Sequence, residues 1–302
     1  MIFNKLFNAI FGQNQKKKIN LLKNYFVKRP DVAMAFVFGS RARGTAIAES
    51  DFDIAVYFWP KDKGLELEEA AYYDGEDKIW LEAEKITGTR VDLVILNRAP
   101  ATVAFAAIQS GQPLVIKSRS LYLRFLLAVS AAAEYFFDFT RDFWMIKQRS
   151  ASLNEIDRER LIRIVDFLET ELADYSKFAD ITQKIYENDS ATRRNMERWA
   201  ENIVNSSIDA AKIILASEKK RIPQTYREIL QELSLVREFN AETAEKLAQF
   251  AKLRNILAHE YIDVRFRQIK KFTKESLPAY SALLYFAKKF IIFIDRSLLP
   301  FT

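Results

Sequence analysis

The sequence predicts an α+β domain, built from a small mixed sheet with helices, followed by an all-α helical bundle. All seven glycines lie before residue 112 and none follows. Because glycine marks the turns between short elements, the first part should alternate strands and helices, whereas the glycine-free part should be helical. A polar break at 148–154 separates the two patterns. We therefore expect an extra N-terminal amphipathic helix at 1–14, the first domain at 15–148 and the second at 149–302.

The first domain should contain three apolar strands, a possible edge strand and four helices. Gly88 and Gly111 fall where two of these helices should end. The expected strands cover 33–38, 53–58, 90–95 and 113–117, and the expected helices cover 19–27, 65–87, 101–110 and 119–147.

The second domain should consist of helices alone. Ser152, three residues before Glu155, forms a capping-box pattern for the first of them, and Pro223 and Pro278 fall where later helices should start. The expected helices cover 155–187, 192–218, 224–235, 241–258 and 274–298.

Length, net charge and cysteine content limit the kinds of protein that this chain can be. The 302 residues suffice for two domains of ordinary size, and a net charge of +6 permits contact with nucleic acid without arguing for it. The absence of cysteine excludes disulfides and thiolate metal sites and fits a cytoplasmic location. No uncharged apolar run reaches transmembrane length, because Arg124 and Glu134 interrupt the most apolar stretch, so no membrane partner is expected.

The first dozen residues have apolar side chains at helical spacing, followed by Lys16, Lys17 and Lys18. We expect a helix that packs on the protein or on a second subunit. The alternative is an anchor on a membrane surface.

The most informative motif joins the first two expected strands. Gly39 and Ser40 follow the first strand, and Asp51 and Asp53 stand where the second begins. Two acids two positions apart on an extended segment point to one face, where their oxygens suit Mg²⁺. Glycine permits close approach of the backbone to phosphates. The sequence therefore predicts a site that binds ATP and Mg²⁺ for nucleotidyl transfer.

Three further residues complete this site. Arg41 and Arg43 carry charge suited to phosphate oxygens, so they join Gly39 and Ser40 as expected ATP-binding residues. Asp92 is an acid inside an apolar strand, where a buried charge is costly without a metal or a partner. We expect Asp92 to be a third metal ligand and to help deprotonate the acceptor.

The segment from Gly39 to Gly44, together with the Asp-x-Asp pair, resembles the MNT-type minimal nucleotidyltransferases of the DNA polymerase β superfamily. The resemblance covers about residues 15–147. It implies ATP as substrate, Mg²⁺ as cofactor, and catalytic roles for Asp51, Asp53 and Asp92.

His259 is the only histidine of the chain. Asn255 lies four positions before it, on the same helical face, and can orient the imidazole. Arg254 lies five positions before it, about 140° away around an ideal helix, so either the helix bends or the two residues act together across a dimer interface. A histidine that moves protons and an arginine that stabilises a phosphorane suit cleavage of RNA without metal.

The run from Leu253 to Tyr261 resembles the Arg-x4-His-x-Tyr motif of HEPN domains of the HepT toxin type. The resemblance extends over about 155–295. It implies an all-helical ribonuclease that acts on RNA as a homodimer or higher oligomer, with Arg254 and His259 as catalytic residues. It also implies that Tyr261 is the tyrosine that a nucleotidyltransferase antitoxin modifies with AMP.

Both modules stand in one chain, which differs from systems in which toxin and antitoxin are separate. We expect a fused toxin–antitoxin protein that modifies Tyr261, in the same chain or in a partner, and so suppresses its ribonuclease. One alternative is a small-molecule nucleotidyltransferase of the aminoglycoside type with a helical substrate domain. The other is a non-enzymatic scaffold that senses nucleotides.

Overall fold

The computed structural model describes residues 13–46, 50–61, 64–69, 71–149, 153–259 and 262–297. The chain forms two compact units, one up to Glu134 and one from Tyr135 onward. The helix expected at 1–14 lies outside the described residues, apart from 13 and 14, which begin α2.

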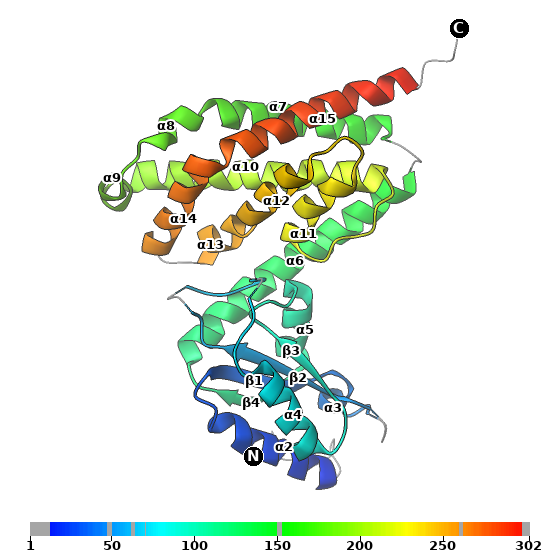
Figure 1. Cartoon of the computed structure of the whole chain (residues 1–302), viewed down its shortest axis with the longest axis vertical. Coiled ribbons are helices and arrows are strands. Elements are labelled where there is room, and N and C mark those ends of the chain that lie inside the picture. Colours follow the sequence, from blue (N-terminus) through cyan, green and yellow to red (C-terminus); the bar gives the residue numbers. More distant parts are fainter. Residues whose placement is uncertain are drawn as a thin grey trace. The chain divides into compact units, whose positions relative to one another are not determined.

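The first unit contains a four-stranded mixed sheet with the strand order β3-β2-β1-β4 (Figure 1). Strands β2 and β3 are parallel, whereas β1 pairs antiparallel with both β2 and β4. This confirms the small mixed sheet expected from the sequence. The strands cover Val32–Phe38 (β1), Phe52–Phe58 (β2), Val91–Ile95 (β3) and Gln112–Ile116 (β4).

Helices bury both faces of this sheet. Alternate residues of β1 and β2, such as Val37 and Ile54, pack in one core with α2 and α4, while Phe36 and Tyr57 pack in another with α5 and α6. Burial on both faces explains why the central strands are continuous apolar runs in the sequence. The four covering helices are Gln13–Val27 (α2), Glu76–Thr87 (α4), Ala101–Ser110 (α5) and Arg119–Arg149 (α6).

The helix expected at 65–87 begins only at Glu76. Gly75 has φ of 96° and Glu68 has φ of 57°, both incompatible with a continuing α-helix. The Glu66 carboxylate accepts hydrogen bonds from Tyr73 Oη at 2.6 Å and from Asn97 Nδ2 at 2.7 Å. The described residues of this segment are therefore held outside the helix by polar contacts that a helical pattern does not reveal.

The second unit is helical throughout its described part, with α10 in its core (Figure 1). The cap of α7 is Asn154, whose side chain accepts a hydrogen bond from the backbone N–H of Asp157; Ser152 lies outside the described residues. The elements are Glu155–Ala173 (α7), Tyr175–Ala179 (α8), Gln183–Asn188 (α9), Ser190–Ser217 (α10), Tyr226–Gln231 (α11), Glu232–Leu235 (η1), Ala241–Phe250 (α12), Leu253–His259 (α13), Ile262–Glu275 (α14) and Leu277–Ser297 (α15).

Two expected long helices are divided. The helix expected at 155–187 is broken into α7, α8 and α9, and the one expected at 241–258 is interrupted after Phe250. Asp174 and Thr182 lie at the first set of breaks, where Thr182 caps α9 through its side chain. Such local polar bonds compete with continued helix although the apolar periodicity persists.

Helix α6 contributes to both units. Its residues up to Ala133 lie in a core of the first unit, whereas Phe136, Phe139, Phe143 and Ile146 lie in the core of the second. The units therefore divide inside α6, earlier than the polar break at 148–154. By length and composition alone, α6 is the one described helix that could cross a membrane, and 39% of its most apolar stretch is buried.

Candidate functional site

Three acidic residues, Asp51, Asp53 and Asp92, lie where strands β2 and β3 begin, and we call this end of the sheet the acidic edge. Asp53 of β2 pairs in register with Asp92 of β3 and, on its other side, with Phe38 of β1. Asp51 precedes Asp53 by two positions, so all three project to one face of the sheet. Strand register thus brings together the acids that the sequence proposed as one site.

Gly39 lies directly against this edge. Its φ is 69°, and a Cβ placed on it would stand 1.9 Å from Oδ2 of Asp53. No residue with a side chain fits this position without displacing the Asp53 carboxylate. Glycine is therefore required at position 39 to leave room for the Asp53 carboxylate. This requirement is separate from the approach to phosphates that the sequence predicts.

Burial and the neighbouring acids both affect the pKa of Asp53 at the acidic edge. Burial raises the pKa of Asp53 above its usual value, the charges of Asp92 and Asp51 raise it further, and Arg43 opposes them. Asp92 itself is exposed, which corrects the expectation of a buried charge: its side chain points away from the core formed by Val91 and Ile95.

The donor set of the acidic edge suits a hard divalent cation, because it consists of carboxylate oxygens alone. Among the described residues, no three His, Cys, Asp or Glu side chains are already arranged around a common metal position. The carboxylates would have to turn toward an ion shared between phosphates and protein. The mutual repulsion at Asp53 is the feature that a cation would relieve.

The two arginines of the motif have different surroundings. Arg41 is only 7% exposed; its Nε donates to the carbonyls of Ser50 and Asp51, at 3.0 and 3.1 Å, and its guanidinium lies 4.3 Å from the centre of the Phe52 ring. Arg41 therefore holds the chain that enters β2. Arg43 is exposed and acts on Asp53 through its charge.

Ser40 and Arg90 complete the surroundings of the acidic edge. The Ser40 hydroxyl is partly exposed in α3 (Gly39–Arg43). The carbonyl of Arg90 accepts a hydrogen bond from the backbone N–H of Phe52, so Arg90 lies alongside Asp51 at the start of β3. Its exposed side chain is a cation that the spacing of the motif did not reveal.

A second candidate site surrounds Arg254 in the other unit. The guanidinium of Arg254 lies 4.1 Å from the centre of the Tyr135 ring and 4.5 Å from that of Tyr226. Helix α13 runs from Leu253 to His259 without interruption. The side chains of Asn255 and His259, and the whole of Tyr261, lie outside the described part of the chain.

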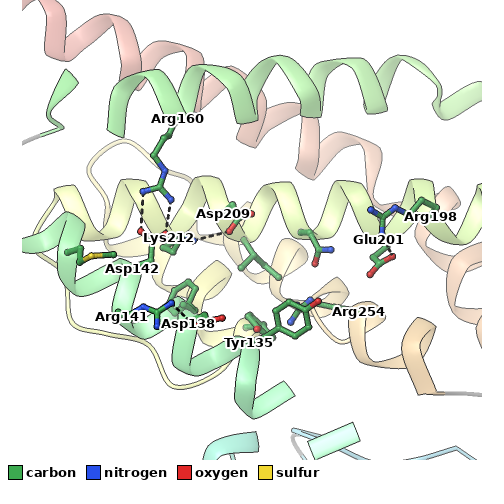
Figure 2. A pocket seen from close by; sticks show the side chains of 15 residues that line it. Tyr135, Asp138, Arg141, Asp142, Arg160, Arg198, Glu201, Asp209, Lys212 and Arg254 are labelled. Carbon is green, nitrogen blue, oxygen red and sulfur yellow. Dashed lines mark hydrogen bonds and ion pairs between the residues drawn. The ribbon is translucent and has the colours of Figure 1, made fainter. Parts of the chain in front are cut away.

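Arg254 opens into a cavity of about 590 Å³, which we call the Arg254 cavity (Figure 2). Its walls come from α6, α7, α10, α11 and α13 and carry charges of both signs. The charged residues that line it are Asp138, Arg141, Asp142, Arg160, Arg198, Glu201, Asp209, Lys212 and Arg254.

Most charges in the Arg254 cavity are paired. Arg160 donates two hydrogen bonds to the Asp142 carboxylate, at 2.7 and 3.1 Å, and Lys212 lies 2.8 Å from the same carboxylate. Burial alone would raise the pKa of Asp142, but the bonds from Arg160 and Lys212 lower it to about 2. This cluster fixes one wall of the cavity (Figure 2).

A polar network lies where α14 packs on α10. Tyr186 Oη donates to Glu197 Oε1 at 2.5 Å, and Arg265 Nη1 lies 3.4 Å from the same oxygen. Burial raises the pKa of Tyr186, and the hydrogen bond to Glu197 raises it further. The network ties α9, α10 and α14 together close in sequence to Tyr261.

Two family models match separate ranges of the chain. Residues 20–120 match the family model described as polymerase beta, nucleotidyltransferase, and residues 168–285 match the one described as ribonuclease HepT-like. The search of curated proteins finds no match.

Two similar solved structures are described as toxin–antitoxin proteins. One, crystallised with AMP-PNP, is 21% identical, with a TM-score of 0.31, covering 39% of this chain and 88% of its own. The other, the toxin–antitoxin MntA–HepT, is also 21% identical, with a TM-score of 0.28, covering 41% and 86%.

Proposed function

We propose that this chain, which joins a nucleotidyltransferase domain of the polymerase beta type to a HepT-like domain, is a fused toxin–antitoxin protein. In this proposal its first half transfers AMP from ATP to Tyr261, in the same chain or in a partner, and thereby suppresses a ribonuclease in its second half. The observation that carries the transferase half is the in-register pairing of Asp53 with Asp92 beside Gly39.

The acidic edge supports a direct transfer. The hydroxyl oxygen of the acceptor tyrosine attacks the α-phosphorus of ATP, the bond from that phosphorus to the bridging oxygen breaks, and pyrophosphate leaves. The hydroxyl proton passes to a carboxylate, for which Asp92 is the proposed acceptor because it is exposed beside Asp53. Magnesium, held by Asp51, Asp53 and Asp92, would neutralise charge on the phosphates and the leaving group.

The binding of ATP is assigned to the residues around Gly39. The backbone there is open to phosphate because Gly39 has no side chain, and Ser40 offers a hydroxyl. Arg43 is exposed and free to meet phosphate oxygens, whereas the proposed contribution of Arg41 is chiefly to hold Asp51 in place.

The proposed ribonuclease centres on Arg254 and His259. His259 would move protons, Arg254 would stabilise negative charge on the phosphate, and Asn255 would orient the imidazole. Both proposed catalytic residues belong to α13, and a separation of five positions corresponds to about 140° around an ideal helix. That separation favours a homodimer in which each centre takes residues from both chains.

Modification of Tyr261 would block this centre. The tyrosine lies two positions from His259, and an added AMP brings negative charge and bulk to the place where RNA phosphate must bind. Fusion holds the two activities at a fixed ratio and a high effective concentration. A covalent switch therefore suits one polypeptide better than release of a separate antitoxin, and the proposed setting is the cytoplasm.

Mass spectrometry tests the transfer. The chain is incubated with ATP and Mg²⁺, and we expect an AMP adduct on the peptide that contains Tyr261. The Tyr261→Phe variant should remain unmodified. An adduct that persists in this variant, or AMP found on an added aminoglycoside instead, would contradict the proposal.

Growth of cells tests the suppression. Expression of Asp53→Asn should be toxic, because the ribonuclease is no longer modified, and adding His259→Ala should relieve the toxicity. If Asp53→Asn is harmless although the protein is folded and abundant, the ribonuclease half has no such activity.

A further inference from the structure

Arg254 differs from the other arginines of its cavity in what holds it. Arg160 is bound by Asp142 and Arg198 by Glu201. Arg254 makes no ion pair within the described residues and lies instead over the rings of Tyr135 and Tyr226, at 4.1 and 4.5 Å. Figure 2 shows Tyr135 beside Arg254.

Two rings fix a guanidinium without using its donors. The attraction runs between the cation and the faces of the rings, so the N–H groups in the guanidinium plane stay available. A carboxylate partner would instead occupy two of these donors and cancel the charge. Arg254 is therefore held in place and still able to bind an anion.

The two rings come from different parts of the chain. Tyr226 begins α11 and is buried, whereas Tyr135 lies in α6 and is 59% exposed. Tyr135 stands between the two ranges that match family models, 20–120 and 168–285. Helix α6, which lies outside both matched ranges at this point, thus supplies a contact to the proposed catalytic arginine.

We propose that Tyr135, together with Tyr226, is a positioning residue that holds Arg254 toward the scissile phosphate of a single-stranded RNA in the Arg254 cavity. The inference rests on the proposed ribonuclease function. A cavity of about 590 Å³ has the size of a nucleotide-binding site. Since Tyr135 is largely exposed, its contact with Arg254, rather than burial in a core, explains its position.

Tyr135 is the better residue to change, because replacing the buried Tyr226 would endanger folding. In the full-length Asp53→Asn protein, which cannot modify itself, Tyr135→Leu removes the ring and keeps an apolar side chain. Tyr135→Phe keeps the ring. The matched control is Tyr285→Leu, which alters a tyrosine of α15 that is 72% exposed.

Cleavage of a single-stranded oligoribonucleotide is measured first. We expect Tyr135→Leu to lower kcat about tenfold, with KM changed by less than about twofold, which corresponds to the strength of one cation–π contact. Tyr135→Phe and Tyr285→Leu should stay within about twofold of the parent. Equal losses in Tyr135→Leu and Tyr135→Phe, or no loss in either, would overturn the positioning role.

The NMR signal of the Arg254 Nε–H group, assigned by its loss in Arg254→Lys, gives a second readout that needs no cleavage. A ring stacked on the guanidinium shifts this signal, so Tyr135→Leu should move it and Tyr135→Phe should not. If the parent cleaves no RNA, the ribonuclease function is overturned. A signal unmoved by Tyr135→Leu overturns the positioning role instead.

Discussion

The acidic edge and the Arg254 cavity are assembled in different ways. At the acidic edge, strand register alone places Asp53 beside Asp92, and Asp51 follows from a spacing of two. At the Arg254 cavity, Tyr135, Tyr226 and Arg254 come from three helices that are far apart in the sequence. Backbone pairing thus fixes the first site, whereas side-chain packing fixes the second.

The two sites also differ in the charges that surround their carboxylates. Burial raises the pKa of Asp53, and the negative charges of Asp92 and Asp51 raise it further. In the cavity, Asp142 is already neutralised by Arg160 and Lys212. Asp53 therefore lies among like charges, whereas the Asp142 carboxylate already has two cationic partners.

Removing one acid from the acidic edge should have the largest effect. Asp53→Asn should lower transfer of AMP by about a thousandfold, because it removes a proposed Mg²⁺ ligand and a negative charge from the acidic edge. Incorporation of radiolabelled AMP measures the effect, with Asp74→Asn, an exposed acid in a loop, as the control. Retained transfer in Asp53→Asn would place the chemistry elsewhere.

Gly39→Ala tests the close contact between position 39 and the Asp53 carboxylate. The added Cβ collides with Asp53 Oδ2, and a displaced carboxylate should lower AMP transfer by about a hundredfold. Gly88→Ala is the matched control, because Gly88 has a similar φ of 62° but no atom within 4 Å of the added Cβ. Backbone strain costs both variants about 1 kcal/mol, so only a difference in activity reports the collision. Equal activities would refute the contact.

Arg41→Lys tests whether the buried contacts of Arg41 beside the acidic edge stabilise the fold. Lysine cannot reproduce the fork that binds the Ser50 and Asp51 carbonyls or the stack on Phe52, so the free energy of unfolding should fall by about 2 kcal/mol. Urea unfolding measures it. Arg43→Lys, on the exposed neighbour, should change stability by less than about 0.5 kcal/mol. A larger loss in Arg43→Lys would reverse these assignments.

The smallest expected effect concerns pH. Because the pKa of Asp142 is lowered to about 2 in the folded chain, its ionised form stabilises the fold at neutral pH. Asp142→Asn should cost about 1 to 2 kcal/mol above about pH 4, and this cost should shrink as the pH falls toward about 2. Urea unfolding at several pH values measures it. Asp138→Asn, at an exposed acid, is the control variant, and a cost for Asp142→Asn that is independent of pH would contradict the charge pairing.

The sequence predicted the acidic edge better than the cavity for a physical reason. A spacing of two and an apolar strand are local signals, and they located Asp51, Asp53 and Gly39 together. The contact of Tyr135 with Arg254 spans more than a hundred positions and leaves no local pattern. The same limit hid the Asp142 cluster.

Polar contacts explain the remaining differences. The sequence motif does not distinguish Arg41 from Arg43. Arg41 becomes buried because it binds backbone carbonyls next to β2, and these carbonyls reach it only when β2 has formed. Similarly, the loop before α4 keeps helical apolar spacing, yet Glu66 and Gly75 hold it in another conformation. The predicted helix boundaries match the structure where apolar packing determines the conformation. They differ where a few hydrogen bonds determine it.

The order of the elements along the chain has a consequence for synthesis on the ribosome. The cores of the first unit end by Ala133, and the acidic edge is complete by Asp92, whereas the second site needs Arg254. Roughly 120 residues separate Ala133 from Arg254, which corresponds to roughly 6 to 24 s of translation at 5 to 20 residues per second. Each newborn chain can therefore fold its proposed transferase before its proposed ribonuclease exists.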